Sequence, residues 1–235
     1  MQLRFLPTSL KSALVFLLAS LGPLVNAQPA GQLYDPEPPA DSAYVRVIVA
    51  SRGAVVDVME DGHPRIVKLK SGEPSDYMVL SAGKHSIAIH AAGKSTAQVS
   101  TTLDIVRGRA MTLAFTTLLS DAEPIVFEDK TNSNKLKSML AVYNLDSKSG
   151  PLDLLTADGN TKVFVGVAHG APASIQVNPI SVELIAAKTG DKTPLTRISI
   201  AMTQGGTYSV FLLPTEGGKL SALAARNKTE RYTAK

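Results

Sequence analysis

Histidine is the side chain most often used as a general base, and the four histidines are therefore the first residues to consider. They are His63, His85, His90 and His169, and the chain contains no cysteine. His63 follows Asp61-Gly62 and His169 precedes Gly170, a setting typical of turns. His85 and His90 lie five residues apart in one expected strand, so they point to opposite faces. Together they cannot hold a metal ion from that strand alone.

The other patterns of reactive residues are equally weak. The chain has no Gly-x-Ser-x-Gly motif, no Gly-Asp-Ser block before an Asp-x-x-His pair, and no glycine-rich phosphate loop. The paired carboxylates Glu60-Asp61 and Asp121/Glu123 fall in expected turns, where acidic residues are common. The sequence thus argues against an enzyme, and we predict no catalytic, cofactor-binding or metal-ligating residue.

Aromatic side chains also offer little for sugar binding. There is no tryptophan, and there are only six tyrosines and six phenylalanines. Six of these aromatics lie in expected strands, where we expect them to pack in cores: Tyr77, Phe115, Tyr143, Phe164, Tyr208 and Phe211. An exposed aromatic platform for a polysaccharide would therefore be thin.

Residues 1–27 have the features of a secretory signal peptide. Arg4 and Lys11 form a basic start, the run from Ala13 to Val25 is uncharged, and Val25-Asn26-Ala27 offers small residues to a signal peptidase. An uncleaved membrane anchor is the alternative, which Gly22-Pro23 within the run disfavours. We expect cleavage after Ala27 and a mature chain that does not span a membrane.

Removing residues 1–27 from the 235 leaves 208, enough for one large β-domain or two smaller ones. Without Arg4 and Lys11, 22 Lys and Arg face 20 Asp and Glu, a net charge of +2. This charge is too small for the positive field that nucleic acids require, so we expect no nucleic-acid partner. Because the chain has no cysteine, its stability must come from packed cores.

Short runs of alternating apolar residues, separated by glycine-containing turns, predict an all-β protein. Four segments recur in the same order in both halves: Tyr44–Ile48 with Leu140–Asn144, Val56–Gly62 with Leu152–Gly159, Ser86–Ala92 with Ser181–Ala187, and Arg107–Leu113 with Gln204–Val210. We therefore predict two tandem immunoglobulin-like antiparallel β-sandwich domains, residues 43–127 and 138–225. The polar stretch 128–137 is the expected linker, and 226–235 a basic mobile tail.

The segment 28–42 that precedes the first expected strand is a proline-rich leader. The stretch LYDPEPPADSAYVRV, residues 33–47, begins within the leader and continues into the first expected strand. This stretch, with the Asp76–Gly83 turn, strongly resembles the alginate O-acetylation protein F (AlgF) family. The similarity covers the mature chain in outline. Related proteins of acetylated-cellulose synthesis cannot be separated from it by motif.

The resemblance implies a non-catalytic periplasmic adaptor required for O-acetylation of a secreted exopolysaccharide in a Gram-negative bacterium. Its implied partners are a membrane acyltransferase and periplasmic hydrolase-like acetyltransferases, with the polysaccharide itself as a further candidate; no cofactor is implied. Two alternatives stay open: an acetyl relay that acts through a serine or histidine, and a plain carbohydrate-binding module.

The leader is also the expected docking segment. Proline-rich chain is stiff and loses little entropy on binding, and Tyr34, Asp35 and Glu37 would offer aromatic and acidic contacts. Arg46 lies between two inward-pointing valines, so we expect it to face away from the core, where it can hold a leader carboxylate or reach a partner. Alternatively, the leader packs across the first sandwich and closes its open end.

Overall fold

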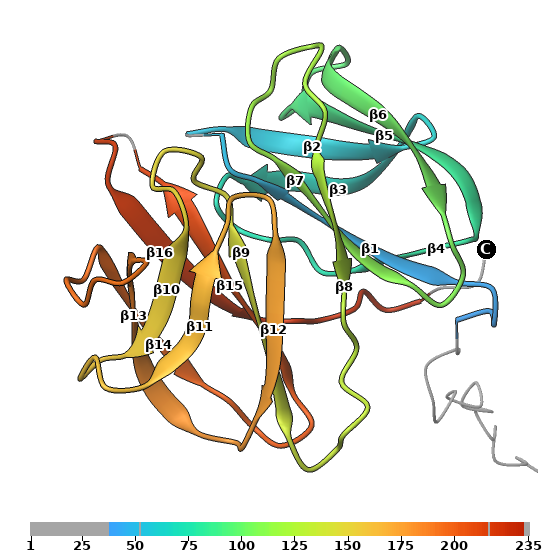
Figure 1. The fold of residues 1–235 in the computed structure, drawn as a ribbon. Helices are drawn as coiled ribbons and strands as arrows, with labels where there is room; N and C mark the ends of the chain where they lie inside the picture. The colour runs from blue at the N-terminus through green and yellow to red at the C-terminus, as the bar shows by residue number, and fades with distance from the viewer. Residues whose placement is uncertain (1–37, 52, 216, 233–235) are drawn as a thin grey trace, which may run out of the picture. The chain divides into compact units, whose positions relative to one another are not determined.

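The computed structural model describes residues 38–51, 53–215 and 217–232, all within a single unit of the chain, Asp35–Lys235. Its regular structure is entirely β (Figure 1). The strands of the first half are β1 (Ala43–Val49), β2 (Val55–Glu60), β3 (His63–Lys70), β4 (Met78–Leu80), β5 (Gly83–Ala91), β6 (Ala97–Ile105), β7 (Ala110–Phe115) and β8 (Ile125–Asp129). Those of the second half are β9 (Ser138–Asn144), β10 (Leu152–Thr156), β11 (Lys162–Val167), β12 (Pro172–Val177), β13 (Ser181–Lys188), β14 (Thr196–Ala201), β15 (Thr207–Pro214) and β16 (Leu220–Arg226).

Each half is a sandwich of two four-stranded sheets with the same strand order. In the first half the orders are β4-β1-β7-β8 and β3-β2-β5-β6. In the second they are β12-β9-β15-β16 and β11-β10-β13-β14, which is the first pattern with every strand number raised by eight. The predicted all-β class of two tandem sandwiches is confirmed. Each half departs from a purely antiparallel design in one pair, β1 with β7 and β9 with β15.

The pairing also corrects the sequence correspondences between the halves. Leu113 and Val210 end the matched segments Arg107–Leu113 and Gln204–Val210. Val47 pairs with Leu113 in the first sandwich and Val142 with Val210 in the second, so Val47 and Val142 are equivalent. The expected match of Tyr44–Ile48 with Leu140–Asn144 was therefore shifted by one residue. The match of Ser86–Ala92 with Ser181–Ala187 was shifted by two, whereas the other two matches start in register.

One aspartate holds the same bulge in both sandwiches. The β2–β3 pairing shifts register around Asp57, whose carboxylate accepts N–H bonds from Lys68 and Gly93, both at 2.8 Å. The β10–β11 pairing shifts around Asp153, which accepts from Gly166 at 2.8 Å and Gly190 at 3.3 Å. The repeated arrangement shows that the two halves share local detail as well as topology.

Each sandwich encloses its own apolar core, and a third core joins the two halves. In β1, Val45, Val47 and Val49 enter the first core, while Ile48 faces the joining core. The joining core contains Ile48, Ala50, Ala114 and Phe127 from the first half and Ala141, Tyr143, Leu145, Phe211 and Leu213 from the second. We call it the junction. Because strands such as β1 and β15 are buried on both faces, they are apolar along most of their length.

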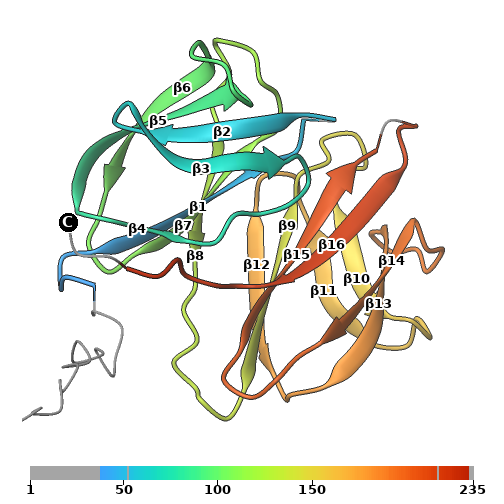
Figure 2. The same ribbon diagram turned by 180° about the vertical axis from the view of Figure 1, so that it is seen from behind.

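Residues 226–235 were expected to form a basic mobile tail, but Arg226 ends β16 and residues 227–232 pair with the first sandwich. This segment reaches the first sandwich beside β4 (Figure 2). Tyr77 donates its N–H to Lys228 O at 2.8 Å and accepts from Glu230 N–H at 2.9 Å. The Glu230 carboxylate accepts from Val79 N–H at 2.9 Å and pairs with Arg65. Backbone pairing holds the segment because β4 has an unpaired edge beside it.

Strand β8 ends at Asp129, so the strand-free connection between the sandwiches is 130–137, slightly shorter than the expected linker. Within the described ranges, no helix is long and apolar enough to cross a membrane.

Candidate functional site: the Glu60–Asp61–His85 cluster

Three ionisable side chains meet where the β2–β3 hairpin passes the start of β5. Glu60 ends β2, and Asp61-Gly62 forms the hairpin turn, with φ of 50° and 80°. Two successive positive φ angles are what a two-residue type I′ turn requires, and Asp-Gly suits it. Because β2 pairs with β5 in antiparallel register and Glu60 lies opposite Ile87, the His85 side chain comes beside the turn.

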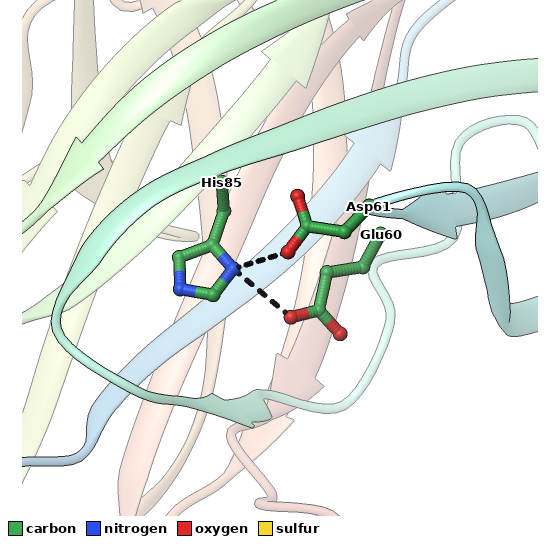
Figure 3. A group of neighbouring side chains, drawn as sticks. All are labelled: Glu60, Asp61 and His85. Atoms are coloured by element: carbon green, nitrogen blue, oxygen red, sulfur yellow. Dashed lines mark hydrogen bonds and ion pairs between the residues drawn. The ribbon is translucent and has the colours of Figure 1, made fainter.

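The two carboxylates converge on one imidazole nitrogen (Figure 3). His85 Nδ1 lies 2.8 Å from Asp61 Oδ2 and 3.1 Å from Glu60 Oε1. The side chains of His85 and Glu60 are only 11 % and 12 % exposed, whereas that of Asp61 is 48 % exposed. The cluster thus opens toward solvent on the Asp61 side.

Each carboxylate is held by its second oxygen. Asp61 Oδ1 accepts the N–H of Ser86 at 2.8 Å, and Glu60 Oε2 accepts from Arg65 Nη1 at 2.8 Å. The Ser86 N–H, followed by the His85 hydrogen bond, lowers the pKa of Asp61 below its usual value despite the opposing effect of desolvation. Asp61 is therefore an anion at neutral pH.

The other nitrogen of the imidazole faces Ser81. His85 Nε2 lies 3.2 Å from the Ser81 carbonyl oxygen and 3.3 Å from Ser81 Oγ. A pocket of about 470 Å³ adjoins this side, lined by the β2–β3 hairpin, the end of β4 with Ser81, and the C-terminal segment. Glu60 and Ser81 both line that pocket, whereas Asp61 and His85 do not.

This arrangement has two chemical uses. Two carboxylate oxygens and an imidazole nitrogen, all within 4.8 Å of one another, are a set of ligands suitable for a metal ion. Ser81 contacts His85, and His85 contacts Asp61, which is the order of a nucleophile, a general base and a group that orients the base. The tautomer of His85 decides between them, because Nε2 must be unprotonated to act as a base.

Sequence reasoning missed this cluster. It assigned Glu60-Asp61 to a turn and separated His85 from His90, and the structure agrees that the two histidines have different partners, His90 facing Lys94 O. The available signal was the Asp61-Gly62 turn together with the later strand Gly83–Ala91, which carries His85. Pairing that strand antiparallel with β2 places a residue near the strand start beside the turn.

The predicted partner-binding residues divide into two groups. Tyr34, Asp35 and Glu37 lie outside the described residues. Arg46 does face away from the core of its own sandwich, but its expected exposure is wrong, because it is only 1 % exposed. The neighbouring sandwich covers the face to which it points.

Arg46 lies in the junction between the two sandwiches. Its Nε donates to Thr112 at 2.8 Å, and its Nη1 to Asn227 at 2.9 Å. Its Nη2 donates to Tyr143 at 3.1 Å and to Ser209 at 2.9 Å. Residues of both halves of the chain therefore accept hydrogen bonds from the guanidinium.

Asp129 balances the charge of Arg46, with Oδ2 4.0 Å from Nε. Its carboxylate accepts hydroxyl hydrogen bonds from Tyr77 and Thr112 on one oxygen and from Tyr143 on the other, at 2.6–2.7 Å. Burial raises the pKa values of Tyr77 and Tyr143, so both phenols stay protonated and donate. Among the described residues, no buried side-chain N or O atom lacks a partner.

The six aromatics expected to pack in cores are all buried, as predicted. Tyr143 stacks on Phe211 with ring centroids 4.9 Å apart and meets Phe127 edge-on at 5.1 Å. Tyr143, Phe211 and Phe127 lie in the junction, which joins the two sandwiches.

Comparison with protein families connects this architecture to a known group. The family model described as "Alginate O-acetyl transferase AlgF" matches residues 16–208 of the chain. The chain belongs to the AlgF family. The match begins before β1 and ends at the start of β15, so it includes the first sandwich and most of the second.

Several AlgF relatives are named alginate biosynthesis proteins. AlgF of Pseudomonas fluorescens is 32% identical over 162 residues, covering 68% of this chain and 67% of the relative. AlgF of Pseudomonas syringae pv. tomato is 29% identical over 191 residues, covering 80% of this chain and 78% of the relative. A solved structure of the C-terminal domain of AlgF from P. aeruginosa is 27% identical, with a TM-score of 0.33, and covers 40% of this chain and all of that domain. The family is one of alginate biosynthesis and O-acetylation.

Proposed function

We propose that this protein is a non-catalytic periplasmic adaptor required for O-acetylation of alginate or a related secreted polymer such as cellulose. The observation that carries the proposal is the AlgF family match over residues 16–208. In this proposal the signal peptide 1–27 directs export, and the mature chain links a membrane acyltransferase to periplasmic acetyltransferase subunits.

The buried junction supports an adaptor. Arg46 bonds to Thr112 of the first sandwich and to Tyr143 and Ser209 of the second, and the junction core packs behind these bonds. Two sandwiches held in this way present their surfaces to partners in a constant arrangement. An adaptor that positions two enzymes benefits from such rigidity, because little conformational entropy is lost on binding.

The leader is the proposed docking segment, through Tyr34, Asp35 and Glu37. Tyr34→Ala is expected to leave the fold intact and to weaken partner binding by about 2 kcal/mol or more, the range of interface hot spots. The measurement is a pull-down of the acetylation machinery from membrane and periplasmic extracts, together with the melting temperature of the same purified variant. A lowered melting temperature with unchanged binding would show that the leader only packs on the protein.

A second candidate function is an acetyl relay through Ser81. Two contacts favour it: Ser81 Oγ lies 3.3 Å from His85 Nε2, and His85 Nδ1 lies 2.8 Å from Asp61 Oδ2. Against it, the Ser81 carbonyl lies 3.2 Å from the same Nε2. A carbonyl can only accept, so it favours a proton on Nε2, and that proton removes the base the serine would need.

One variant separates the adaptor from the relay. In cells that lack the natural gene, Ser81→Ala is expected to restore polymer acetylation to the wild-type level if the protein is an adaptor. A relay would lose acetylation with this variant, and the wild type would gain the mass of one acetyl group at Ser81 after incubation with an activated acetyl ester. Ser100→Ala, an exposed serine on β6, is the matched control.

The carbohydrate-binding alternative has its own test. Titration of the purified protein with acetylated and unacetylated polymer is expected to show no tight binding. Tight binding without any protein partner would argue against an adaptor.

A further inference from the structure

We propose that Glu60, Asp61 and His85 form a binding site for a divalent transition-metal cation, with Zn²⁺ as the best-suited ion. The site is independent of the adaptor function proposed above. It rests on the convergence of three ligand atoms, on the contacts that hold them, and on a comparison between the two sandwiches.

Two carboxylates converge on a single imidazole nitrogen. His85 Nδ1 faces two carboxylate oxygens, at 2.8 Å and 3.1 Å, but carries at most one proton. One N–H cannot point well at both acceptors, whereas a cation among the three atoms attracts all of them. Zinc binds imidazole nitrogen and carboxylate oxygen at about 2.0–2.2 Å, so only small shifts would admit it.

Each ligand is oriented from its far side, as in established metal sites. His85 Nε2 can donate to the Ser81 carbonyl at 3.2 Å, which leaves the Nδ1 lone pair directed at the carboxylates. The Ser86 N–H holds Asp61, and Arg65 holds Glu60. The imidazole favours a transition metal over Mg²⁺ or Ca²⁺, which prefer oxygen alone.

The second sandwich shows that the fold does not need these residues. Val58 pairs with Ile89 and Leu154 with Ala186, which makes Glu60, Asp61 and His85 equivalent to Thr156, Ala157 and Val182. The backbone bond Asp61 N–H to Ser86 O recurs as Ala157 N–H to Glu183 O. The second sandwich therefore keeps this backbone bond with three side chains that cannot hold a metal ion in this way, although its hairpin loop is longer, residues 157–161 against 61–62.

The site is also open to a further ligand. Three protein ligands leave a fourth tetrahedral position, as zinc sites with an exchangeable water do. Water or an oxygen of a bound molecule can reach this position from the Asp61 side, where the cluster is open to solvent, and Glu60 also lines the pocket of about 470 Å³. A metal on Nδ1 also keeps the proton on Nε2, so the metal site and the Ser81 relay exclude each other.

Zinc binding by the purified mature protein, carrying no histidine tag, tests the proposal. Isothermal titration with Zn²⁺ is expected to give one site per chain, and the melting temperature is expected to rise with zinc concentration. X-ray absorption of the zinc-loaded protein is expected to show one imidazole with oxygen donors. Several imidazoles, or none, would overturn the site.

The sister sandwich supplies matched variants. Glu60→Thr and His85→Val introduce the residues found at the equivalent positions, and Asp61→Gly removes the carboxylate while tolerating the φ of 50° in the turn, so the fold is expected to persist. Each is expected to weaken zinc binding by more than about 10-fold, the smallest loss seen when even an outer hydrogen-bond partner of a ligand is removed. His90→Gln, on the same strand, is expected to bind like the wild type. No zinc binding by the wild type, unchanged binding in the three variants, or an equal loss in His90→Gln would refute the proposal.

Discussion

Arg46 illustrates how one residue joins two domains. A buried guanidinium is costly unless its donors and its charge are satisfied. Here Thr112, Asn227, Tyr143 and Ser209 accept its hydrogen bonds, and Asp129 supplies the opposite charge. The equivalent position in β9 is Ala141, so the two sandwiches share this single arginine rather than one each.

Replacing Arg46 should therefore be severe. Arg46→Met is expected to lower the free energy of unfolding by about 3 kcal/mol or more, because Asp129 stays buried without a cation. Urea denaturation measures the change.

The matched control is Arg109→Met, which removes an exposed ion pair with Glu128 and is expected to change stability by less than about 0.5 kcal/mol. In the double variant Arg46→Met/Asp129→Asn, the loss should be smaller than the sum of the two single losses. A loss below about 1 kcal/mol for Arg46→Met would contradict this account of the junction.

At the scale of the element, the bulge in β3 and β11 depends on one left-handed residue. Lys68 has φ of 57°, and Gly166, at the matching position, has φ of 62°. Both donate their N–H to the aspartate of the neighbouring strand. Glycine adopts this conformation without the steric cost that lysine pays.

Exchanging these residues should have opposite effects. Gly166→Ala is expected to destabilise the second sandwich by about 1 kcal/mol, because a side chain is strained at that φ. Lys68→Gly removes the same strain from the first sandwich and is expected to leave stability equal or higher. Thermal denaturation of both variants, compared with the wild type, measures the difference. A loss of stability in Lys68→Gly alone would show that the bulge does not work in this way.

The aspartate of the same bulge gives a dependence on pH. Burial raises the pKa of Asp153, but the N–H groups of Gly166 and Gly190 and the ammonium of Lys162 lower it further, to below its usual value. Its folded pKa thus lies below its unfolded pKa of about 3.9. The stabilisation is present above that value and is lost as pH falls through the folded pKa.

Asp153→Asn is accordingly expected to be less stable than the wild type at pH 7, with a difference that shrinks below about pH 4. Urea denaturation at pH 7 and pH 3 measures both. A difference that stays constant between the two pH values would refute the assignment.

For the whole molecule, the junction and the C-terminal segment make two sandwiches into one unit. The connection 130–137 is short, and the segment 227–232 returns from the second sandwich to pair with Tyr77 in the first. The two halves are therefore joined by buried apolar side chains and backbone hydrogen bonds as well as by the chain itself.

Cutting the connection should not separate the halves. Limited trypsin digestion is expected to cut first at Lys130, Lys135 or Lys137, and the two fragments should elute together in size-exclusion chromatography. Arg46→Met should let the nicked fragments separate, because it removes hydrogen bonds that cross the junction. Fragments of the wild type that separate in native buffer would show that the junction does not hold them.

Local chemistry was enough to predict the strands and the two-sandwich repeat. These features are local patterns in the sequence: alternating apolar residues, glycine turns, and the matched segments Val56–Gly62 and Leu152–Gly159. The proline-rich stretch and the Asp76–Gly83 turn likewise indicated the family.

Only the tertiary structure determines that Arg46 is buried. The same holds for the proximity of Glu60, Asp61 and His85. Whether Arg46 faces solvent depends on what covers the outer face of β1, and that surface comes from residues about a hundred positions away. The cluster depends on the register of β2 against β5, where a shift of one residue would turn His85 to the other face of the sheet. Sequence alternation assigns a residue to a face, but only pairing and packing determine which other residues meet it there.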